Sequence, residues 1–164
     1  MKKILLLSDT HSHIDVQIIK YVKQCDEVWH AGDIGSIEVV DTLKKLKPLR
    51  AVYGNIDNHI IKSEYPLDAK FTMEDVNVWM THIGGYPNHY DARIRKEIQQ
   101  NPPTLFISGH SHILKVMFDK KLNTLHLNPG AIGKHGFHKV RTMLRFQIDK
   151  AKISNLEIIE FKRP

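Results

Sequence analysis

The first third of the chain alternates short apolar runs with amphipathic segments. Three short runs are mostly apolar and end in polar residues, which is typical of buried strands: 3–9, 27–33 and 49–55. Between them, residues 14–24 and 36–47 carry apolar side chains at close to helical spacing, and Ser36 is placed to cap the second helix. This β-α-β-α-β order predicts parallel strands joined by crossover helices.

The remaining two thirds of the chain have a different pattern. One helix is predicted over 90–100, and Pro102 and Pro103 end it. A further buried strand is predicted over 104–110. The other apolar runs form pairs joined by short turns, which favours antiparallel strands: 69–75 with 76–82, 115–119 with 123–130, and 140–149 with 152–161. The whole pattern predicts an α/β fold with mixed β-sheets.

Length and composition are those of an ordinary globular domain. A chain of 164 residues can bury a hydrophobic core without disulfides or a structural metal, so we expect one domain over 1–164. The composition is 41% hydrophobic and 26% charged, which fits this class. Cys25 is the single cysteine, so no internal disulfide can form, and this fits a reducing compartment.

The sequence has neither the pattern of a secretion signal nor that of a membrane span. The apolar run after the basic start is four residues long and ends at Ser8. A signal needs roughly 7–15 apolar residues and a span roughly 20, so we expect a cytoplasmic protein with no membrane partner. The net charge of +6 favours anionic partners, but the basic residues are spread along the chain, which argues against a nucleic-acid-binding patch.

Metal-capable side chains follow the ends of five predicted strands, and sites in α/β sheets form outside such carboxyl ends. The five groups are Asp9-Thr10-His11, Gly32-Asp33, Gly54-Asn55-Ile56-Asp57, His82 and Gly109-His110-Ser111-His112. Taken singly, each has an ordinary alternative, such as a turn residue for Asn55 or a loop histidine for His82. Because all five place Asp, Asn or His at a strand end, we expect them to converge on one metal site.

The ordered set DxH…GD…GNxD…H…GHxH resembles the calcineurin-like metallophosphoesterase superfamily, in particular its small single-domain phosphodiesterase-like branch. Asn128-Pro129-Gly130 is similar to a further segment of that branch, and the resemblance covers nearly the whole chain. It implies a four-layer αββα sandwich with mixed β-sheets and a metal site at the C-terminal ends of the strands. It also implies a dinuclear-metal-dependent phosphoesterase, more a phosphodiesterase than a phosphomonoesterase, in which metal-activated hydroxide attacks a small phosphate ester.

The resemblance implies two metal sites that share one carboxylate. One site is formed by Asp9, His11, Asp33 and His112, and the other by Asp33, Asn55, His82 and His110. In this scheme Asp33, Asn55 and His82 also count as catalytic residues. Mixed imidazole and oxygen ligands favour two divalent transition metal ions, Mn, Fe, Zn or Ni, over calcium.

One position departs from the family pattern. Many members carry a histidine directly after the asparagine that corresponds to Asn55, and it is thought to supply a proton to the leaving group; here this position is Ile56. Asp57, His59 and His13 are candidate replacements. For Asp57 the favoured role is instead to orient a metal-binding histidine by hydrogen bonding.

Three further polar residues have two interpretations each, and a fourth has a structural one. Lys134 and His138, within the glycine-rich segment 128–141, either contact substrate phosphate or belong to a solvated loop. His30 either supports a metal ligand or packs in the core. His126 is expected to be structural.

The sequence favours an enzyme over two alternatives. The retromer scaffold subunit resembles the same branch but has lost part of its metal set, whereas all seven implied ligands are present here, so a non-catalytic protein-binding scaffold is the second hypothesis. A nuclease is the third, but 164 residues leave no room for the extra domains of such family members. We therefore expect a small phosphate-ester substrate, and no nucleic acid beyond short or cyclic nucleotides. A homo-oligomer is left open.

Overall fold

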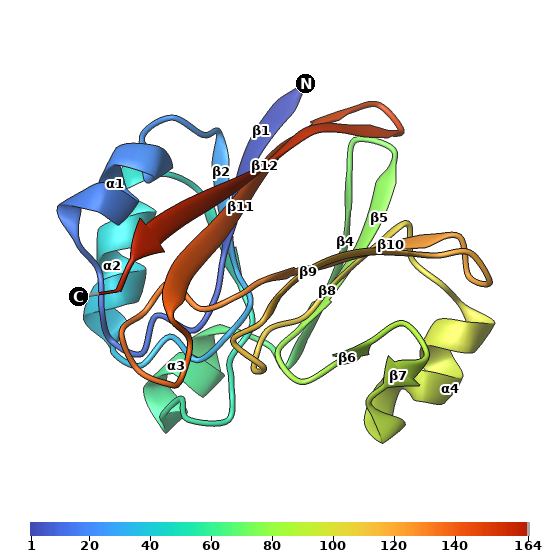
Figure 1. Cartoon of the computed structure of the whole chain (residues 1–164), viewed down its shortest axis with the longest axis horizontal. Coiled ribbons are helices and arrows are strands. Elements are labelled where there is room, and N and C mark those ends of the chain that lie inside the picture. The colour runs from blue at the N-terminus through green and yellow to red at the C-terminus, as the bar shows by residue number, and fades with distance from the viewer. Residues whose placement is uncertain (164) are drawn as a thin grey trace.

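Two five-stranded sheets dominate the computed structural model, which describes residues 1–163 (Figure 1). The first sheet has the strand order β12-β11-β1-β2-β3, with bounds β1 Lys2–Leu7, β2 Glu27–His30, β3 Leu49–Ala51, β11 Val140–Asp149 and β12 Lys152–Lys162. The second sheet has the order β4-β5-β8-β10-β9, with bounds β4 Asp68–Met73, β5 Val76–Thr81, β8 Leu105–Ile107, β9 Leu114–Asp119 and β10 Thr124–Pro129.

Strand directions confirm the predicted parallel start and the three predicted antiparallel pairs, β4 with β5, β9 with β10 and β11 with β12. The strands β1, β2 and β3 are parallel, and β11 lies antiparallel to β1. In the second sheet β5, β8 and β10 are also parallel, and antiparallel pairing is confined to the edge strands β4 and β9. The parallel centre arises because helix α4 (Ala92–Gln100) returns the chain between β5 and β8, and β9 returns it between β8 and β10.

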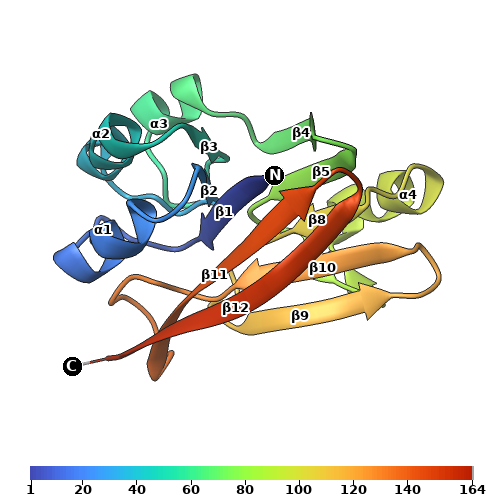
Figure 2. The same cartoon turned by 90° about the horizontal axis from the view of Figure 1, so that it is seen from above.

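Helices cover the outer faces of both sheets (Figures 1 and 2). Helices α1 (Val16–Val22) and α2 (Ile37–Leu46) pack on the first sheet, and α4 packs on the second. Ser36 is at the predicted N-cap of α2, although its hydroxyl makes no capping bond. The layer order is therefore helix, sheet, sheet, helix, which is the αββα sandwich.

Three apolar clusters hold these layers together. Strand β1 contributes to two of them, one on each of its faces. Its side chains alternate, so that Ile4 and Leu6 join the cluster between the two sheets while Leu5 and Leu7 join the cluster under α1 and α2. Both faces of this strand are buried, and for that reason its sequence is a continuous apolar run. The third cluster lies between the second sheet and α4.

Three short elements have no counterpart in the sequence prediction: α3 (His59–Glu64), β6 (Gly85–Tyr86) and β7 (His89–Tyr90). Helix α3 buries only Ile61, so no periodic apolar pattern marks it, although the Asn58 side chain caps its start by accepting from the Ile61 N–H. Strands β6 and β7 pair only with each other. Within residues 1–163, no helix combines the length and the apolar composition that a bilayer crossing requires.

Candidate metal centre

The loops after five strands converge on one cleft. These loops follow β1, β2 and β3 of the first sheet and β5 and β8 of the second. The structure thereby brings together all seven side chains singled out as ligands: Asp9, His11, Asp33, Asn55, His82, His110 and His112. The sheets that carry them lie face to face, so the cleft forms where both sheets end.

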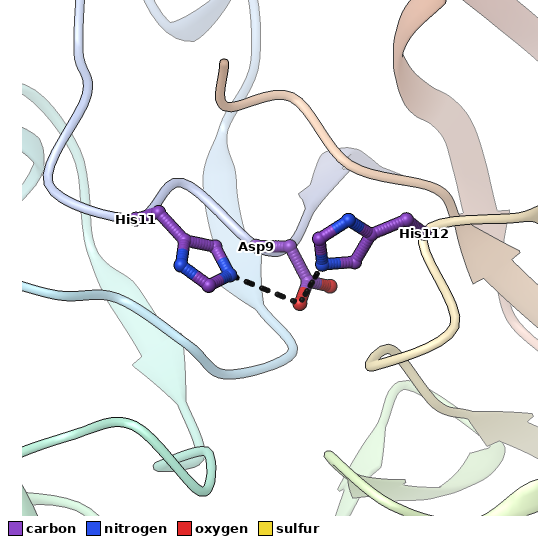
Figure 3. Close-up of side chains that lie close together, drawn as sticks. All are labelled: Asp9, His11 and His112. Atoms are coloured by element: carbon purple, nitrogen blue, oxygen red, sulfur yellow. Dashed lines mark ion pairs between the residues drawn. The ribbon is translucent and has the colours of Figure 1, made fainter. Parts of the chain in front are cut away.

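One group of donor atoms surrounds the carboxylate of Asp9. Asp9, His11 and His112 each offer one atom, and these atoms lie within 4.8 Å of one another. The Nε2 atom of His112 is 3.2 Å from Asp9 Oδ1, and that of His11 is 3.9 Å away. Figure 3 shows the two imidazoles on either side of this carboxylate.

A second group of donor atoms surrounds the carboxylate of Asp33. It contains Asp33, His82 and His110, again with all donor atoms within 4.8 Å. The Oδ2 atom of Asp33 is 3.2 Å from His82 Nε2, and it is also 3.4 Å from His11 Nε2 of the first group. Asp33 therefore lies between the two groups, and His110 and His112 belong to different groups.

Buried atoms without hydrogen-bond partners show that the donor set fits a metal. In the described part of the chain five buried side-chain atoms lack a partner, and three of them lie together: Asp9 Oδ1 is 3.9 Å from both His11 Nε2 and His82 Nε2. Buried polar atoms are nearly always paired. The other ring nitrogen of His82, Nδ1, is 2.7 Å from the Ala31 carbonyl. A neutral His82 that donates from Nδ1 has its free electron pair on Nε2, as a metal ligand requires.

The carboxylates keep their negative charge although they are buried. Burial raises the pKa of Asp9, but the neighbouring His11 and His112 outweigh it and hold that pKa well below its usual range. Burial likewise opposes ionisation of Asp33, and His82 offsets it, so the pKa of Asp33 is lowered. The cleft therefore presents two ionised carboxylates to a cation.

Backbone geometry at the donors is unusual. Five of them have positive φ angles: Asp9 (55°), His11 (44°), Asp33 (55°), His110 (71°) and His112 (61°). Non-glycine residues pay a conformational cost there, and such residues cluster at functional sites. Two neighbouring glycines are needed for space: a Cβ on Gly32 would lie 2.6 Å from His82 Nδ1, and one on Gly54 would lie 2.1 Å from Asp33 Oδ1.

Asp57 holds the ligand loops together instead of orienting a histidine, which corrects the sequence expectation. Its buried carboxylate accepts hydrogen bonds from the backbone N–H groups of Ile34, Gly35 and Gly54, at 3.2, 2.8 and 2.7 Å. These amides belong to the loops that carry Asp33 and Asn55. Asp57 therefore fixes two ligand loops of the first sheet relative to each other.

His30 connects the loops after β1 and β2. Its Nε2 lies 3.0 Å from the hydroxyl of Thr10, and its Nδ1 accepts from the Gly32 N–H at 3.1 Å. Full burial lowers the pKa of His30 to about 4, so the ring is neutral. The ring is thus buried in the core and hydrogen-bonds to the segments that contain Asp9 and Asp33.

His138 and Lys134, the two loop residues singled out from the sequence, differ in their position relative to the cleft. His138 lies beside His112, with ring centroids 5.3 Å apart, and its Nε2 is 2.8 Å from the Gly133 carbonyl. Lys134 is exposed and is not among the described residues that line the cleft. Sequence reasoning missed His135, whose ring stacks on that of His11 at 4.7 Å.

Comparison with known proteins agrees with this architecture. A probable metallophosphoesterase of Methanothermobacter thermautotrophicus is 29% identical over 133 residues, which cover 77% of this chain and 74% of the relative. An archaeal phosphodiesterase of known structure superimposes with a TM-score of 0.78 and 21% identity, covering 97% of this chain and 99% of the other. Vps29 of Entamoeba histolytica in complex with zinc superimposes with a TM-score of 0.75 and 15% identity, and 99% of each chain is covered. These two structures share the fold.

The family assignment rests on a match along most of the sequence. The calcineurin-like phosphoesterase superfamily domain matches residues 1–151, which include every strand end that carries a donor side chain. The donor groups around Asp9 and Asp33 lie within that match. The chain therefore belongs to the calcineurin-like phosphoesterase superfamily.

Proposed function

We propose that this protein is a dinuclear-metal-dependent phosphoesterase, and a phosphodiesterase more than a phosphomonoesterase. One ion is held by Asp9, His11, Asp33 and His112, and the other by Asp33, Asn55, His82 and His110. The observation that carries the proposal is the place of Asp33, whose Oδ2 lies 3.4 Å from His11 Nε2 and 3.2 Å from His82 Nε2. A carboxylate in this position suits a ligand shared by two cations.

The chemistry of the donors supports transition metal ions. Asp9 and Asp33 supply negative charge, the imidazoles supply neutral nitrogen, and Asn55 adds a neutral carbonyl oxygen without further charge. This mixed set suits Mn²⁺, Fe, Zn²⁺ or Ni²⁺. Two bound ions would offset the charge of the phosphate and lower the pKa of water, so that hydroxide attacks phosphorus at neutral pH.

Two of the candidate proton donors, His13 and Asp57, are engaged elsewhere. Ile56 cannot donate a proton, and His13 is held 2.8 Å from Asp15 at the start of α1. The carboxylate of Asp57 is occupied by backbone amides. We therefore expect esters whose leaving groups depart without a proton, such as p-nitrophenolate, to be hydrolysed fastest.

The test is hydrolysis of bis-p-nitrophenyl phosphate by the wild type and by Asp33→Ala, each with added Mn²⁺ or Ni²⁺. We expect metal-dependent activity that the substitution abolishes. Asp41→Ala is the matched control, because Asp41 is exposed on α2, away from the cleft. The proposal fails if the wild type is inactive with every such metal, or if Asp33→Ala behaves as the wild type does.

A protein-binding scaffold is the second candidate function. The likeness to Vps29, with a TM-score of 0.75, favours it. The intact donor set supports the enzyme more strongly, because a scaffold has no need for buried, unpartnered carboxylate and imidazole atoms. A protein that takes up no metal and hydrolyses no ester, but binds another protein through the cleft face, would reverse this order.

A further inference from the structure

The cleft above the donor atoms has an apolar lip. The cleft measures about 560 Å³, and the charged and polar donors line it together with three large apolar side chains: Ile56, Ile113 and Phe137. These three are 47%, 57% and 105% exposed. They come from the loop after β3, the loop after β8 and the loop before β11, so the chain assembles the apolar lip from three distant segments.

Such an arrangement differs from scattered surface hydrophobicity. Single exposed apolar residues are normal in globular proteins, whereas a group around one concave site marks a place where a ligand binds. Here the apolar side chains stand beside His11, Asp33 and His112 in the same cleft. A ligand that fits this cleft has an anionic part next to the donors and an apolar part next to the apolar lip.

The loop that carries Phe137 is held in place. The Arg163 guanidinium donates to the carbonyls on both sides of Phe137, those of Gly136 and His138, at 2.5 and 2.8 Å. Gly136 has a φ of 123°, and a Cβ there would lie 2.4 Å from His112 Nδ1. The loop thus packs directly against a donor histidine, and the backbone that carries the fully exposed Phe137 side chain is held beside the site. A backbone that is already held in place loses less entropy on binding.

The charges of the cleft exclude one class of substituent. The chain has 24 lysines and arginines, yet none of them lines the cleft in the described part of the molecule. No lysine or arginine is therefore present there to pair with a second phosphate or a carboxylate on the substrate. Substituents with further negative charge would lack partners, whereas an apolar ring would remove the apolar lip from water.

We infer that Phe137, with Ile56 and Ile113, is a specificity determinant that binds a flat apolar substituent of the substrate. The substrate class is then a phosphodiester that carries an aryl ring or a comparable planar group on the phosphate. This inference rests on the proposed phosphodiesterase function and specifies its substrate. In this proposal the exposed ring of Phe137 packs on the substituent, and the two isoleucines complete the apolar surface.

The kinetic test uses two diesters with the same leaving group, phenyl p-nitrophenyl phosphate and methyl p-nitrophenyl phosphate. We expect the wild type to favour the phenyl ester by about tenfold in kcat/KM, as one aromatic contact and its buried area would give. Phe137→Ala should bring this ratio close to one. An equal fall with both esters, which leaves the ratio unchanged, would indicate a disturbed donor site and would overturn the inference. Values unchanged for both esters also overturn it.

Two matched controls separate the apolar lip from general surface effects. Phe118 is 55% exposed on β9 and Ile60 is 44% exposed in α3, and neither lines the cleft. Phe118→Ala and Ile60→Ala should keep the wild-type ratio, whereas Phe137→Ala and Ile56→Ala should lower it. If Phe118→Ala lowers the ratio as much as Phe137→Ala does, the apolar lip does not determine specificity.

A binding measurement tests the apolar lip without catalysis. Phenylphosphonate and methylphosphonate have no ester bond, and calorimetry on metal-loaded protein gives their affinities. We expect phenylphosphonate to bind about tenfold more tightly to the wild type and equally with methylphosphonate to Phe137→Ala. If this preference holds while no diester is hydrolysed, the apolar lip stands and the catalytic proposal fails. If diesters are hydrolysed without any preference, catalysis stands and the apolar lip fails as a substrate site, which leaves it free for a protein partner.

Discussion

The end of the first sheet and the end of the second sheet contribute different chemistry to the same cleft. The first sheet supplies Asp9 and Asp33, which are 0% and 3% exposed, together with His11 and Asn55. The second sheet supplies imidazoles alone: His82, His110 and His112. The negative charge thus comes from one sheet, and most of the neutral nitrogen donors come from the other.

This difference has a consequence for the whole fold. Neither sheet alone can surround a cation with both kinds of ligand, so the site exists only while the apolar core holds the sheets face to face. A metal that binds across the two sheet ends stabilises this packing in turn, because ligands that bind only the folded state favour it. The predictions below test how far the two sheets depend on each other.

The largest effect is expected from a buried imidazole of the second sheet. His82 and His126 are 1% and 0% exposed, and each has its Nδ1 near a backbone carbonyl and an unpartnered Nε2. Only His82 faces a carboxylate, Asp33. His82→Ala should lower kcat/KM by more than the roughly 100-fold that loss of a supporting residue costs. His126→Ala should keep activity within about threefold wherever it folds, as checked by circular dichroism. Equal losses in both variants would remove His82 from the site.

A smaller effect is expected from a buried carboxylate of the first sheet that touches no metal. Asp57→Asn weakens the hydrogen bonds to the loops of Asp33 and Asn55, and it should reduce metal affinity by about 10–100-fold. Asp119→Asn is the control, because Asp119 is also buried and accepts backbone N–H groups but lies in the hairpin of β9 and β10. Calorimetric titration with Mn²⁺ distinguishes the two, and unchanged affinity in Asp57→Asn would contradict the supporting role.

Removal of metal should lower the thermal stability of the protein. One ion at 100 times its Kd contributes about 2.7 kcal/mol. At about 2–4 °C per kcal/mol for a chain of this size, chelation should lower Tm by roughly 5–10 °C. Calorimetry with and without EDTA measures the shift, which Asp33→Ala should lack. A Tm that does not respond to metal would mean that the two sheets are not linked by it.

The smallest effect is the contribution of His126, which faces no carboxylate, to the pH dependence of stability. Burial lowers the pKa of His126 to about 4, whereas neighbouring carboxylates outweigh burial at His82 and raise its pKa. Above pH 6.5 His126 is neutral in both folded and unfolded states, so it adds no pH dependence. As pH falls from 6.5 towards 4 the unfolded chain binds the proton first, and stability is lost.

Urea unfolding at pH 7 and pH 4.5 measures this loss. We expect His126→Gln to remove about 2 kcal/mol of the fall in unfolding free energy between the two pH values. The pKa of His30 is also lowered to about 4 by burial, so His30 contributes to the fall in unfolding free energy equally in the wild type and the variant. An identical fall in wild type and variant would show that His126 is not the source.

Much of the candidate site was accessible from the sequence because its residues follow apolar strands directly. Asp9, Asp33 and His110 each come at most three residues after a strand ends, so strand ends and chemical type suffice to group them. The carboxyl ends of parallel strands meet at one edge of a sheet, which turns this sequence pattern into proximity.

Other features depend on contacts that no local pattern encodes. The amide partners of Asp57 lie up to 23 residues away, and the carbonyls on either side of Phe137 accept from Arg163, near the other end of the last hairpin. The parallel centre of the second sheet depends on where β8 and β10 insert, whereas hydrophobic alternation alone does not distinguish parallel from antiparallel neighbours. Helix α3 escaped prediction because it has one buried residue, Ile61.

The most direct test of the dinuclear centre is the number of metal ions that one chain retains. Wild type, Asp33→Ala and the control Asp41→Ala are loaded with Mn²⁺, freed of excess metal by desalting, and measured by elemental analysis. We predict two ions per chain in the wild type and in Asp41→Ala, and fewer than one in Asp33→Ala, because in the proposed centre both ions share that carboxylate. A wild type that retains one ion or none, or an Asp33→Ala variant that retains two, would contradict the account.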